Sequence, residues 1–230
     1  MNSGTKWQAR FATVVFDVDS TIASIEGIDW LAERRNAEIA AQCIALTTSA
    51  MAGEMPFEHV YTRRLELIRP TQVDLNALAD AYLESVAPRA AQLIKGLQAV
   101  GTTVLLVSGG LHAAIAPLAR LLAVPAKHVH AVHVLANANG EFVMLDGVQP
   151  LTTQQGKPHV ISQLNLERPT VMIGDGATDA AARGVVDTFI AYTGIARRES
   201  VVAVADATAH DFVELVPLLL AIVDPVEERI

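Results

Sequence analysis

Cysteine is almost absent from this sequence. Cys43 is the single cysteine in 230 residues, so the chain forms no internal disulfide and no cysteine-rich zinc site. A chain without disulfides is typical of a reducing compartment, and we expect a cytoplasmic location. No arginine follows Cys43 at the spacing of a phosphate-binding loop, so we expect its thiol in a hydrophobic core rather than as a nucleophile.

Long hydrophobic runs and an excess of positive charge are also missing. The apolar run after Arg10 is broken at Asp17, before it reaches the about 7–15 residues of a signal core or the about 20 of a membrane span. Lys and Arg number 17 against 25 Asp and Glu, which gives a formal net charge of −8. Nucleic acids and anionic membranes require clustered basic side chains, so we expect neither as a partner.

The chain does have the apolar residues that a folded core needs, because 51% of it is hydrophobic and 18% is charged. Three short, β-branched runs, at residues 11–16, 102–107 and 169–173, are typical of strands buried on both faces of a parallel sheet. Each is followed by small or acidic residues and then by a helical pattern. This alternation predicts an α/β fold with a Rossmann-like, mostly parallel sheet, and a site at the carboxyl ends of its strands.

Two inserts interrupt this alternation. Residues 22–88 are rich in Ala, Leu, Glu and Arg and contain no convincing strand, so we expect a helical cap domain inserted into a core of residues 1–21 and 89–230. Within residues 131–147, the dipeptide Asn139-Gly140 predicts a small β-hairpin.

The tail of the chain contains two further apolar segments. We expect residues 201–205 to form a strand and residues 212–223 to form a closing helix.

Acidic side chains follow two of the expected strands. Asp17 and Asp19 come directly after the first strand, and Asp175 and Asp179 follow the third. Carboxylates held close together repel unless a cation or a shared proton compensates, so this pattern implies a hard divalent metal such as Mg²⁺. The alternative is a solvated acidic turn.

Other known motifs fail on spacing. An EF-hand starting at Asp17 needs glycine and glutamate where Ile22 and Ile28 stand. A dinucleotide-binding fingerprint lacks its third glycine because Asp179 takes that position, and a serine nucleophile elbow needs glycine at Leu106. A metal-assisted phosphoryl site is the better account.

The residue types suit that chemistry. The Asp17 carboxylate is ionised at neutral pH and can attack phosphorus directly, which forms an aspartyl-phosphate. Asp19 can protonate the leaving alcohol and later deprotonate the hydrolytic water. Mg²⁺ offsets the repulsion between an anionic nucleophile and an anionic substrate. Ser108 and the backbone amides of Gly109 and Gly110, expected at a helix start, form a cradle for phosphate oxygens.

Four segments in this order resemble the four motifs of the haloacid dehalogenase superfamily, and the resemblance extends over nearly the whole chain. It is closest to the phosphoserine phosphatases, and it implies a Rossmann-like core, a helical cap inserted after the first motif, and Mg²⁺. The segments are Asp17-Val-Asp-Ser-Thr21, Ser108-Gly-Gly110, Lys157 and Gly174-Asp-Gly-Ala-Thr-Asp179. Taken alone, Lys157 is an ordinary exposed lysine, and only its place in the series makes it a phosphate-binding cation.

The resemblance also implies roles for single residues. Asp17 resembles the nucleophile and Asp19 the general acid and base. Asp17, the main-chain carbonyl of Asp19, and Asp175 resemble the metal ligands. Asp179 resembles the acid that supports the metal from nearby, and Thr178 stands where a substrate contact is expected.

Residues of the expected cap resemble the pocket for a zwitterionic amino-acid head. Glu26 matches the glutamate that receives the amino group, and Arg64 matches the arginine that holds the carboxylate through its bidentate fork. Met51 and Phe57 match the apolar wall. Taken alone, Glu26 is more typical of a helix start, Arg64 of a surface arginine and Phe57 of a cap core, and it is their joint occurrence in family order that favours the pocket. Ala52 departs from the usual glycine of the family.

The sequence therefore predicts an Mg²⁺-dependent phosphomonoesterase that converts L-phosphoserine to L-serine, as a monomer or homodimer. Three alternatives remain open. A phosphotransferase would pass the phosphoryl group to an acceptor alcohol such as homoserine, and a related phosphatase would act on another small metabolite. A non-catalytic binding module is disfavoured by the complete set of Asp17, Asp19, Lys157 and Asp175.

Overall fold

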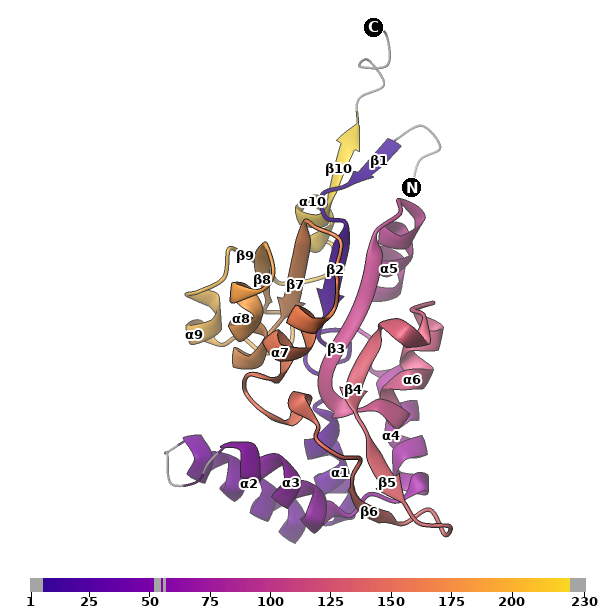
Figure 1. Ribbon diagram of the computed structural model, residues 1–230, viewed down its shortest axis with the longest axis vertical. Coiled ribbons are helices and arrows are strands. Elements are labelled where there is room, and N and C mark those ends of the chain that lie inside the picture. Colours follow the sequence, from indigo (N-terminus) through magenta and orange to yellow (C-terminus); the bar gives the residue numbers. More distant parts are fainter. Residues whose placement is uncertain (1–5, 52–54, 56, 224–230) are drawn as a thin grey trace, which may run out of the picture.

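A six-stranded parallel sheet forms the centre of the computed structural model, which describes residues 6–51, 55 and 57–223 (Figure 1). The strand order is β4-β3-β2-β7-β8-β9, and every neighbouring pair is parallel. This confirms the predicted α/β fold. The strands are β2 (Thr13–Phe16), β3 (Thr103–Leu111), β4 (Val129–Val132), β7 (Thr170–Gly174), β8 (Thr188–Tyr192) and β9 (Ala207–Ala209).

β2 lies in the middle of the sheet, and all four of its residues are buried. Its last residue, Phe16, is in register with Leu106 of β3 and with Ile173 of β7. The chain therefore leaves β2 and β7 at the same edge of the sheet. In an open α/β sheet, ligands bind at such an edge, next to the strand where the order of connections reverses.

Alternate residues of β2 supply the hydrophobic layers on the two faces of the sheet. Val14 and Phe16 belong to the layer that contains apolar side chains of α5, α6 and α10, whereas Val15 belongs to the layer that contains those of α7 and α9. This alternation is what a strand buried on both faces requires. The helices are α5 (Ala90–Ala99), α6 (His112–Leu121), α7 (Gly156–Gln163), α8 (Ala177–Ala181), α9 (Glu199–Val202) and α10 (Leu215–Leu219).

Residues 22–88 are mainly helical, as predicted, and their helices lie beyond the carboxyl ends of the sheet strands (Figure 1). A capping box begins the last helix, because the Thr71 hydroxyl accepts from the Asp74 amide while the Asp74 carboxylate accepts from the Thr71 amide. Cys43 is fully buried, as expected. The four helices are α1 (Gly27–Arg35), α2 (Ala37–Met51), α3 (Phe57–Ile68) and α4 (Gln72–Glu84).

The predicted hairpin is present as β5 (Val134–Ala136) and β6 (Phe142–Leu145), which pair antiparallel. Gly140 turns the chain between them with a φ of +76°, a conformation that glycine adopts without strain. Its carbonyl accepts a hydrogen bond of 2.8 Å from the amide of Gln72. The hairpin thus contacts the start of α4.

Both predictions for the tail are wrong. Residues 201–205 include the end of helix α9, and residues 212–223 contain the short helix α10 followed by strand β10 (Leu220–Val223). β10 pairs antiparallel with β1 (Lys6–Ala9), which begins the described chain at the opposite end of the sheet from α1 (Figure 1). Short apolar runs do not distinguish helix from strand, and the partner of β10 is more than 200 residues away.

Short 3-10 helices complete the fold at Ala126–His128, Pro150–Thr152 and Ala182–Gly184. Among the described residues, no helix is both long and apolar enough to cross a bilayer.

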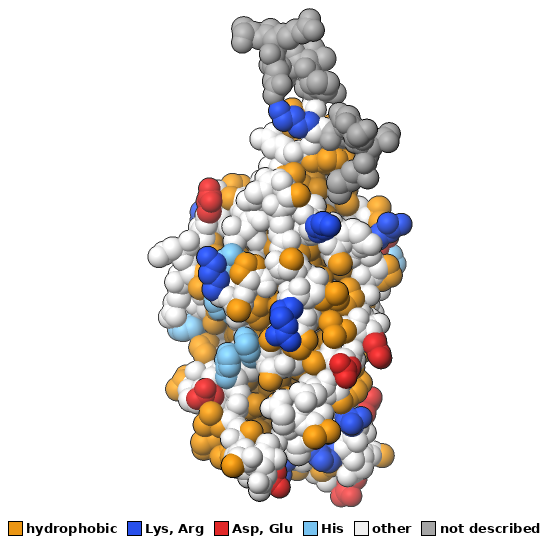
Figure 2. Space-filling model, turned by 90° about the vertical axis from the view of Figure 1, so that its right-hand side faces the viewer, with side chains coloured by type: hydrophobic (Ala, Val, Ile, Leu, Met, Phe, Trp, Pro, Cys, Tyr) orange, Lys and Arg blue, Asp and Glu red, His pale blue; other side chains and the backbone are white. Residues whose placement is uncertain are grey.

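Figure 2 shows histidine side chains gathered on one face of the molecule, and the rings of His112 and His133 stack with centroids 4.3 Å apart. Burial and the neighbouring His133 lower the pKa of His112.

Candidate active site

The loop after β2 carries the first two acidic residues into the site. The Asp17 amide donates a 2.9 Å hydrogen bond to the carbonyl of Ile173, which extends the pairing of β2 with β7 by one residue. The chain then turns sharply, with Ser20 in the left-handed region at a φ of +50°. Hydrogen bonding between adjacent strands therefore places Asp17, and the turn that follows places Asp19 beside the same pocket.

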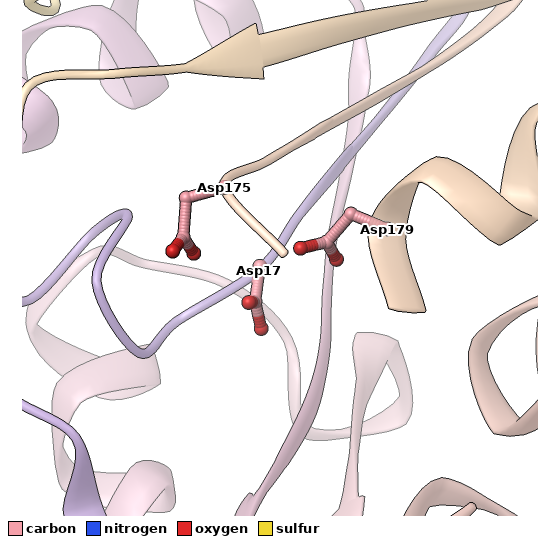
Figure 3. Close-up of side chains that lie close together, drawn as sticks. All are labelled: Asp17, Asp175 and Asp179. Atoms are coloured by element: carbon pink, nitrogen blue, oxygen red, sulfur yellow. The ribbon is translucent and has the colours of Figure 1, made fainter. Parts of the chain in front are cut away.

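Three carboxylates converge at this edge of the sheet (Figure 3). Oxygen atoms of Asp17, Asp175 and Asp179 all lie within 4.8 Å of one another. Lys157 of α7 reaches two of them, and its Nζ lies 2.7 Å from Asp17 Oδ1 and 2.5 Å from Asp179 Oδ1. Burial alone lowers the pKa of Lys157, but the two carboxylates outweigh it and raise the pKa above its usual value. The lysine is therefore a permanent cation.

Asp175 pairs with an arginine, whereas the other two carboxylates of this cluster pair with Lys157. Its Oδ1 accepts a long hydrogen bond of 3.4 Å from Thr21, and its Oδ2 is buried and accepts none among the described residues. Arg198 forms an ion pair with that same oxygen. An oxygen that already pairs with a cationic group, in a cluster of three carboxylates whose oxygens lie within 4.8 Å of one another, fits a cation ligand, and hard divalent cations prefer oxygen donors. The cluster is thus suited to hold a metal.

Asp19 is held by three donors. Its Oδ1 accepts from the Gly27 amide and from the Tyr82 hydroxyl, both at 2.7 Å, and its Oδ2 accepts from the Ser108 hydroxyl at 3.1 Å. Burial, followed by the charge of Asp17, raises the pKa of Asp19. A carboxyl group with a raised pKa can hold a proton and deliver it to a leaving group.

The expected phosphate cradle differs from the prediction in one respect. Gly109 and Gly110 belong to the end of β3 and do not start a helix, because α6 begins at His112. The Gly110 amide donates to the Ser108 hydroxyl at 2.9 Å. The Gly109 carbonyl accepts a hydrogen bond of 2.7 Å from Tyr61 of α3. This strand end is therefore linked directly to the helical segment.

A cavity of about 190 Å³ is lined by residues of the helical segment, residues 22–88, and by residues of the part of the chain that forms the sheet. It brings together eight residues that the sequence singles out. Ser108 and Asp179 do not line it but contact Asp19 and Lys157, which do, and an oxygen of Asp175 lies within 4.8 Å of one of Asp17. The side chains of Met51 and Phe57 lie outside the described residues. The eight residues are Asp17, Asp19, Glu26, Arg64, Gly109, Gly110, Lys157 and Thr178.

The helical segment supplies two charged groups to this cavity. Partial burial, followed by the charge of Asp19, raises the pKa of Glu26 to about 7, although its side chain is 45% exposed and Ser20 donates a 2.7 Å hydrogen bond to its Oε1. Arg64 forms an ion pair with Asp29, and its buried Nε has no hydrogen-bond partner among the described residues. On this side of the cavity, the charge of Glu26 complements an amino group and the charge of Arg64 complements a carboxylate.

Sequence reasoning missed three residues of the site. Tyr82 and Tyr61 lie on helices, where an aromatic side chain in the sequence indicates only a core position. Arg198 is the second of two adjacent arginines, and it reaches Asp175 and, at 3.7 Å, Glu26. None of the three carries a local sequence signal for its role.

A buried aspartate at the end of the central strand, beside a second acid, a lysine and a carboxylate cluster that could hold a cation, suits phosphoryl transfer to an aspartate. The chain belongs to the haloacid dehalogenase-like hydrolase family, whose model matches residues 14–182.

Relatives within this family cover most of the chain. It is 38% identical over 208 residues to the chloroplastic phosphoserine phosphatase of Arabidopsis thaliana, an alignment that covers 88% of this chain and 70% of the relative. It is 36% identical over 209 residues to the phosphoserine phosphatase of Bos taurus, and that alignment covers 90% of this chain and 92% of the relative.

Solved structures share the fold. A phosphoserine phosphohydrolase-like protein from Francisella tularensis superposes with a TM-score of 0.75 at 24% identity, over 90% of this chain and 98% of that one. A phospho-aspartyl intermediate analogue of phosphoserine phosphatase superposes with a TM-score of 0.72 at 23% identity, with the same coverage of both chains.

Proposed function

We propose that this chain hydrolyses L-phosphoserine to L-serine and inorganic phosphate through an aspartyl-phosphate on Asp17. The observation that carries the proposal is the composition of the pocket, in which Asp17 and Asp19 come from the sheet and Glu26 and Arg64 come from the helical segment. The first pair suits a phosphate ester, and the second suits a zwitterionic amino acid. Relatives that are 36–38% identical and bear the name phosphoserine phosphatase support this substrate.

In the first step, a carboxylate oxygen of Asp17 attacks phosphorus while the bond from phosphorus to the serine oxygen breaks. Asp19 donates its proton to that departing oxygen, so serine leaves as a neutral alcohol. Burial, followed by the charge of Asp17, raises the pKa of Asp19, which favours its protonated form. Lys157, already within 2.7 Å of Asp17, contributes positive charge where negative charge develops.

In the second step, water attacks the phosphorus of the aspartyl-phosphate. Asp19, now a carboxylate, takes a proton from that water as the bond between phosphorus and the Asp17 oxygen breaks. Inorganic phosphate forms, and Asp17 returns to its ionised state. One carboxyl group thus serves both steps, as acid and then as base.

Mg²⁺ is the cofactor that this donor set fits, with Asp17, the main-chain carbonyl of Asp19, and Asp175 as ligands and Asp179 nearby as a supporting acid. When bound, it neutralises negative charge on the phosphoryl oxygens and on Asp17. The convergence of the Asp17, Asp175 and Asp179 carboxylates supports this assignment. Arg198, which pairs with Asp175 Oδ2, has to give it up when the metal binds.

The helical segment binds the amino and carboxylate groups of the substrate. Glu26 receives the amino group, and Arg64 holds the carboxylate, which takes over the contact that Asp29 makes in this structure. Ser108, Gly109, Gly110 and Thr178 contact the phosphate. We assign residues 22–88 to a cap domain over a core of residues 1–21 and 89–230, because the pocket draws residues from both.

The test is a panel of phosphorylated metabolites assayed for phosphate release with Mg²⁺ and with EDTA. Phosphoserine should give the highest kcat/KM, and EDTA should abolish turnover until excess Mg²⁺ restores it. A higher kcat/KM for another metabolite would replace the proposed substrate. Added homoserine should yield no phosphohomoserine, whereas its formation would indicate a phosphotransferase.

A further inference from the structure

We propose that Tyr82 is a positioning residue for proton transfer: its hydroxyl fixes the Asp19 carboxyl group so that Oδ2, and not Oδ1, exchanges the proton with substrate and water. The inference deepens the proposed function, because it rests on Asp19 as the acid and base of that reaction. Tyr82 lies near the end of α4 and is fully buried. A buried aromatic ring packs without a hydroxyl group, so packing alone does not account for the hydroxyl of Tyr82.

The first argument is the count of hydrogen bonds on the two oxygens of Asp19. A carboxylate oxygen offers about two lone pairs in the plane of the group. Oδ1 uses both, because the Gly27 amide and the Tyr82 hydroxyl each donate at 2.7 Å. Oδ2 receives one longer hydrogen bond, from Ser108 at 3.1 Å, and keeps one lone pair for a proton.

The second argument is the space that the backbone leaves around this hydroxyl. A Cβ atom on Gly27 would lie 2.1 Å from the Tyr82 hydroxyl oxygen. A Cβ atom on Gly110 would lie 3.0 Å from the same oxygen and 2.9 Å from Asp19 Oδ2. Two glycines from separate elements, the start of α1 and the end of β3, thus make room for the contact between Tyr82 and Asp19. The contact belongs to a built site rather than to chance packing.

The consequence is a defined path for the proton. In the first step the proton leaves Oδ2 for the serine oxygen while the bond from Asp17 to phosphorus forms and the ester bond breaks. In the second step Oδ2 receives a proton from the attacking water while the bond from phosphorus to Asp17 breaks. Without the Tyr82 hydroxyl, Oδ1 has a free lone pair and competes with Oδ2 for the proton.

The experiment compares two leaving groups in the variant Tyr82→Phe. Serine leaves as an alcohol that needs a proton, whereas p-nitrophenolate leaves without one. We expect the single-turnover rate on phosphoserine to fall about tenfold or more, with KM nearly unchanged. The burst of p-nitrophenolate from p-nitrophenyl phosphate should change less than about twofold, and the slower steady state after it should reveal impaired hydrolysis of the intermediate.

Tyr192 of β8 provides the matched control, since it is also buried and packs against Phe212 away from the pocket. Tyr192→Phe should leave both rates unchanged. Equal slowing of both substrates by Tyr82→Phe, or no slowing of either, would overturn the inference. If Tyr82→Phe fails to fold, 4-fluorophenylalanine at position 82 keeps the bulk, lacks the donor and gives the same comparison. A wild-type chain inactive on phosphoserine would instead overturn the proposed function.

Discussion

The two sides of the pocket are built in different ways. On the sheet side, the side chains of Asp17, Lys157 and Asp179 are 9%, 5% and 0% exposed, and each charge has an opposite charge in contact with it. On the helical side, the side chains of Glu26 and Asp29 are 45% and 48% exposed. The sheet side is a buried cluster in which carboxylates outnumber the lysine that they share, whereas the helical side is half open to solvent.

This difference corresponds to two tasks. Stabilising a transition state requires charges that are already in place, because moving them during the reaction costs free energy. Backbone pairing of β2 with β7 meets this need by holding Asp17. Binding and releasing a substrate requires groups that exchange partners, and the ion pair of Arg64 with the exposed Asp29 is of that kind. Substitutions on the two sides should therefore have different effects.

The largest effect is expected on the sheet side, for Asp17→Asn. The variant keeps the shape of the side chain but removes the nucleophile, so turnover should fall by orders of magnitude on every substrate. Steady-state kinetics measures the loss, and thermal unfolding verifies the fold. Asp187→Asn, which changes a surface carboxylate paired with Arg168, should keep full activity. Near-wild-type turnover of Asp17→Asn would show that the sheet side does not supply the nucleophile.

On the helical side, Arg64→Ala should act on one substrate only. The loss of a charge-assisted contact to the substrate carboxylate corresponds to about 1.5–3 kcal/mol, or roughly ten- to a hundredfold in kcat/KM for phosphoserine. p-Nitrophenyl phosphate has no carboxylate, and its hydrolysis should hardly change.

Arg63 is the matched control for this prediction. Its side chain is 59% exposed and pairs with Glu66 on the surface of α3, so Arg63→Ala should leave both substrates unaffected. Equal losses on both substrates in Arg64→Ala would make that arginine a structural part of the helical segment, and the contrast between the two sides would disappear.

A smaller effect is expected from pH, through Glu26. With its pKa raised to about 7, Glu26 becomes neutral as the pH falls below that value and no longer attracts the substrate ammonium group. KM for phosphoserine should therefore rise from pH 8 to pH 6, by up to about tenfold per pH unit below the pKa. Glu26→Gln should remove this slope. The same slope in KM for p-nitrophenyl phosphate would assign it to the sheet side instead.

The smallest effect concerns the helical segment as a folded unit. Thr71→Ala removes the hydroxyl that accepts from the Asp74 amide at 3.2 Å, and loss of such a cap costs about 1 kcal/mol. Urea unfolding should show this decrease while kcat on phosphoserine stays unchanged. Thr48→Ala, on the exposed surface of α2, should shift stability by less than about 0.5 kcal/mol. A fall in kcat with Thr71→Ala would mean that the chemistry depends on the stability of α4.

Much of the sheet side could be predicted from the sequence. Short apolar runs revealed β2, β3 and β7, and acids directly after two of them placed Asp17 and Asp175 at one edge, because parallel strands end together. The hairpin followed from Asn139-Gly140, whose turn chemistry is local. Strands β4 and β8 were not predicted, and the tail was assigned wrongly, because short apolar runs fit either a helix or a strand.

The helical side was predicted less completely. Resemblance to a family pointed to Glu26 and Arg64, but the partner of each was not evident. Asp29 pairs with Arg64 across 35 residues of sequence, and Arg198 approaches Glu26 from the other end of the chain. Helical periodicity tells which face of a helix is apolar, and it does not tell which polar group of another element that helix meets.

By itself the sequence determined the elements with strong local signals: the buried strands, the acids that follow them and the order of the motifs. Tertiary structure alone decided which groups share a charge or a proton. Tyr82 meets Asp19 across 63 residues, and β1 meets β10 across the length of the chain. Local patterns depend on neighbours in sequence, whereas these contacts depend on how helices and sheet pack, and that packing is set by the whole core.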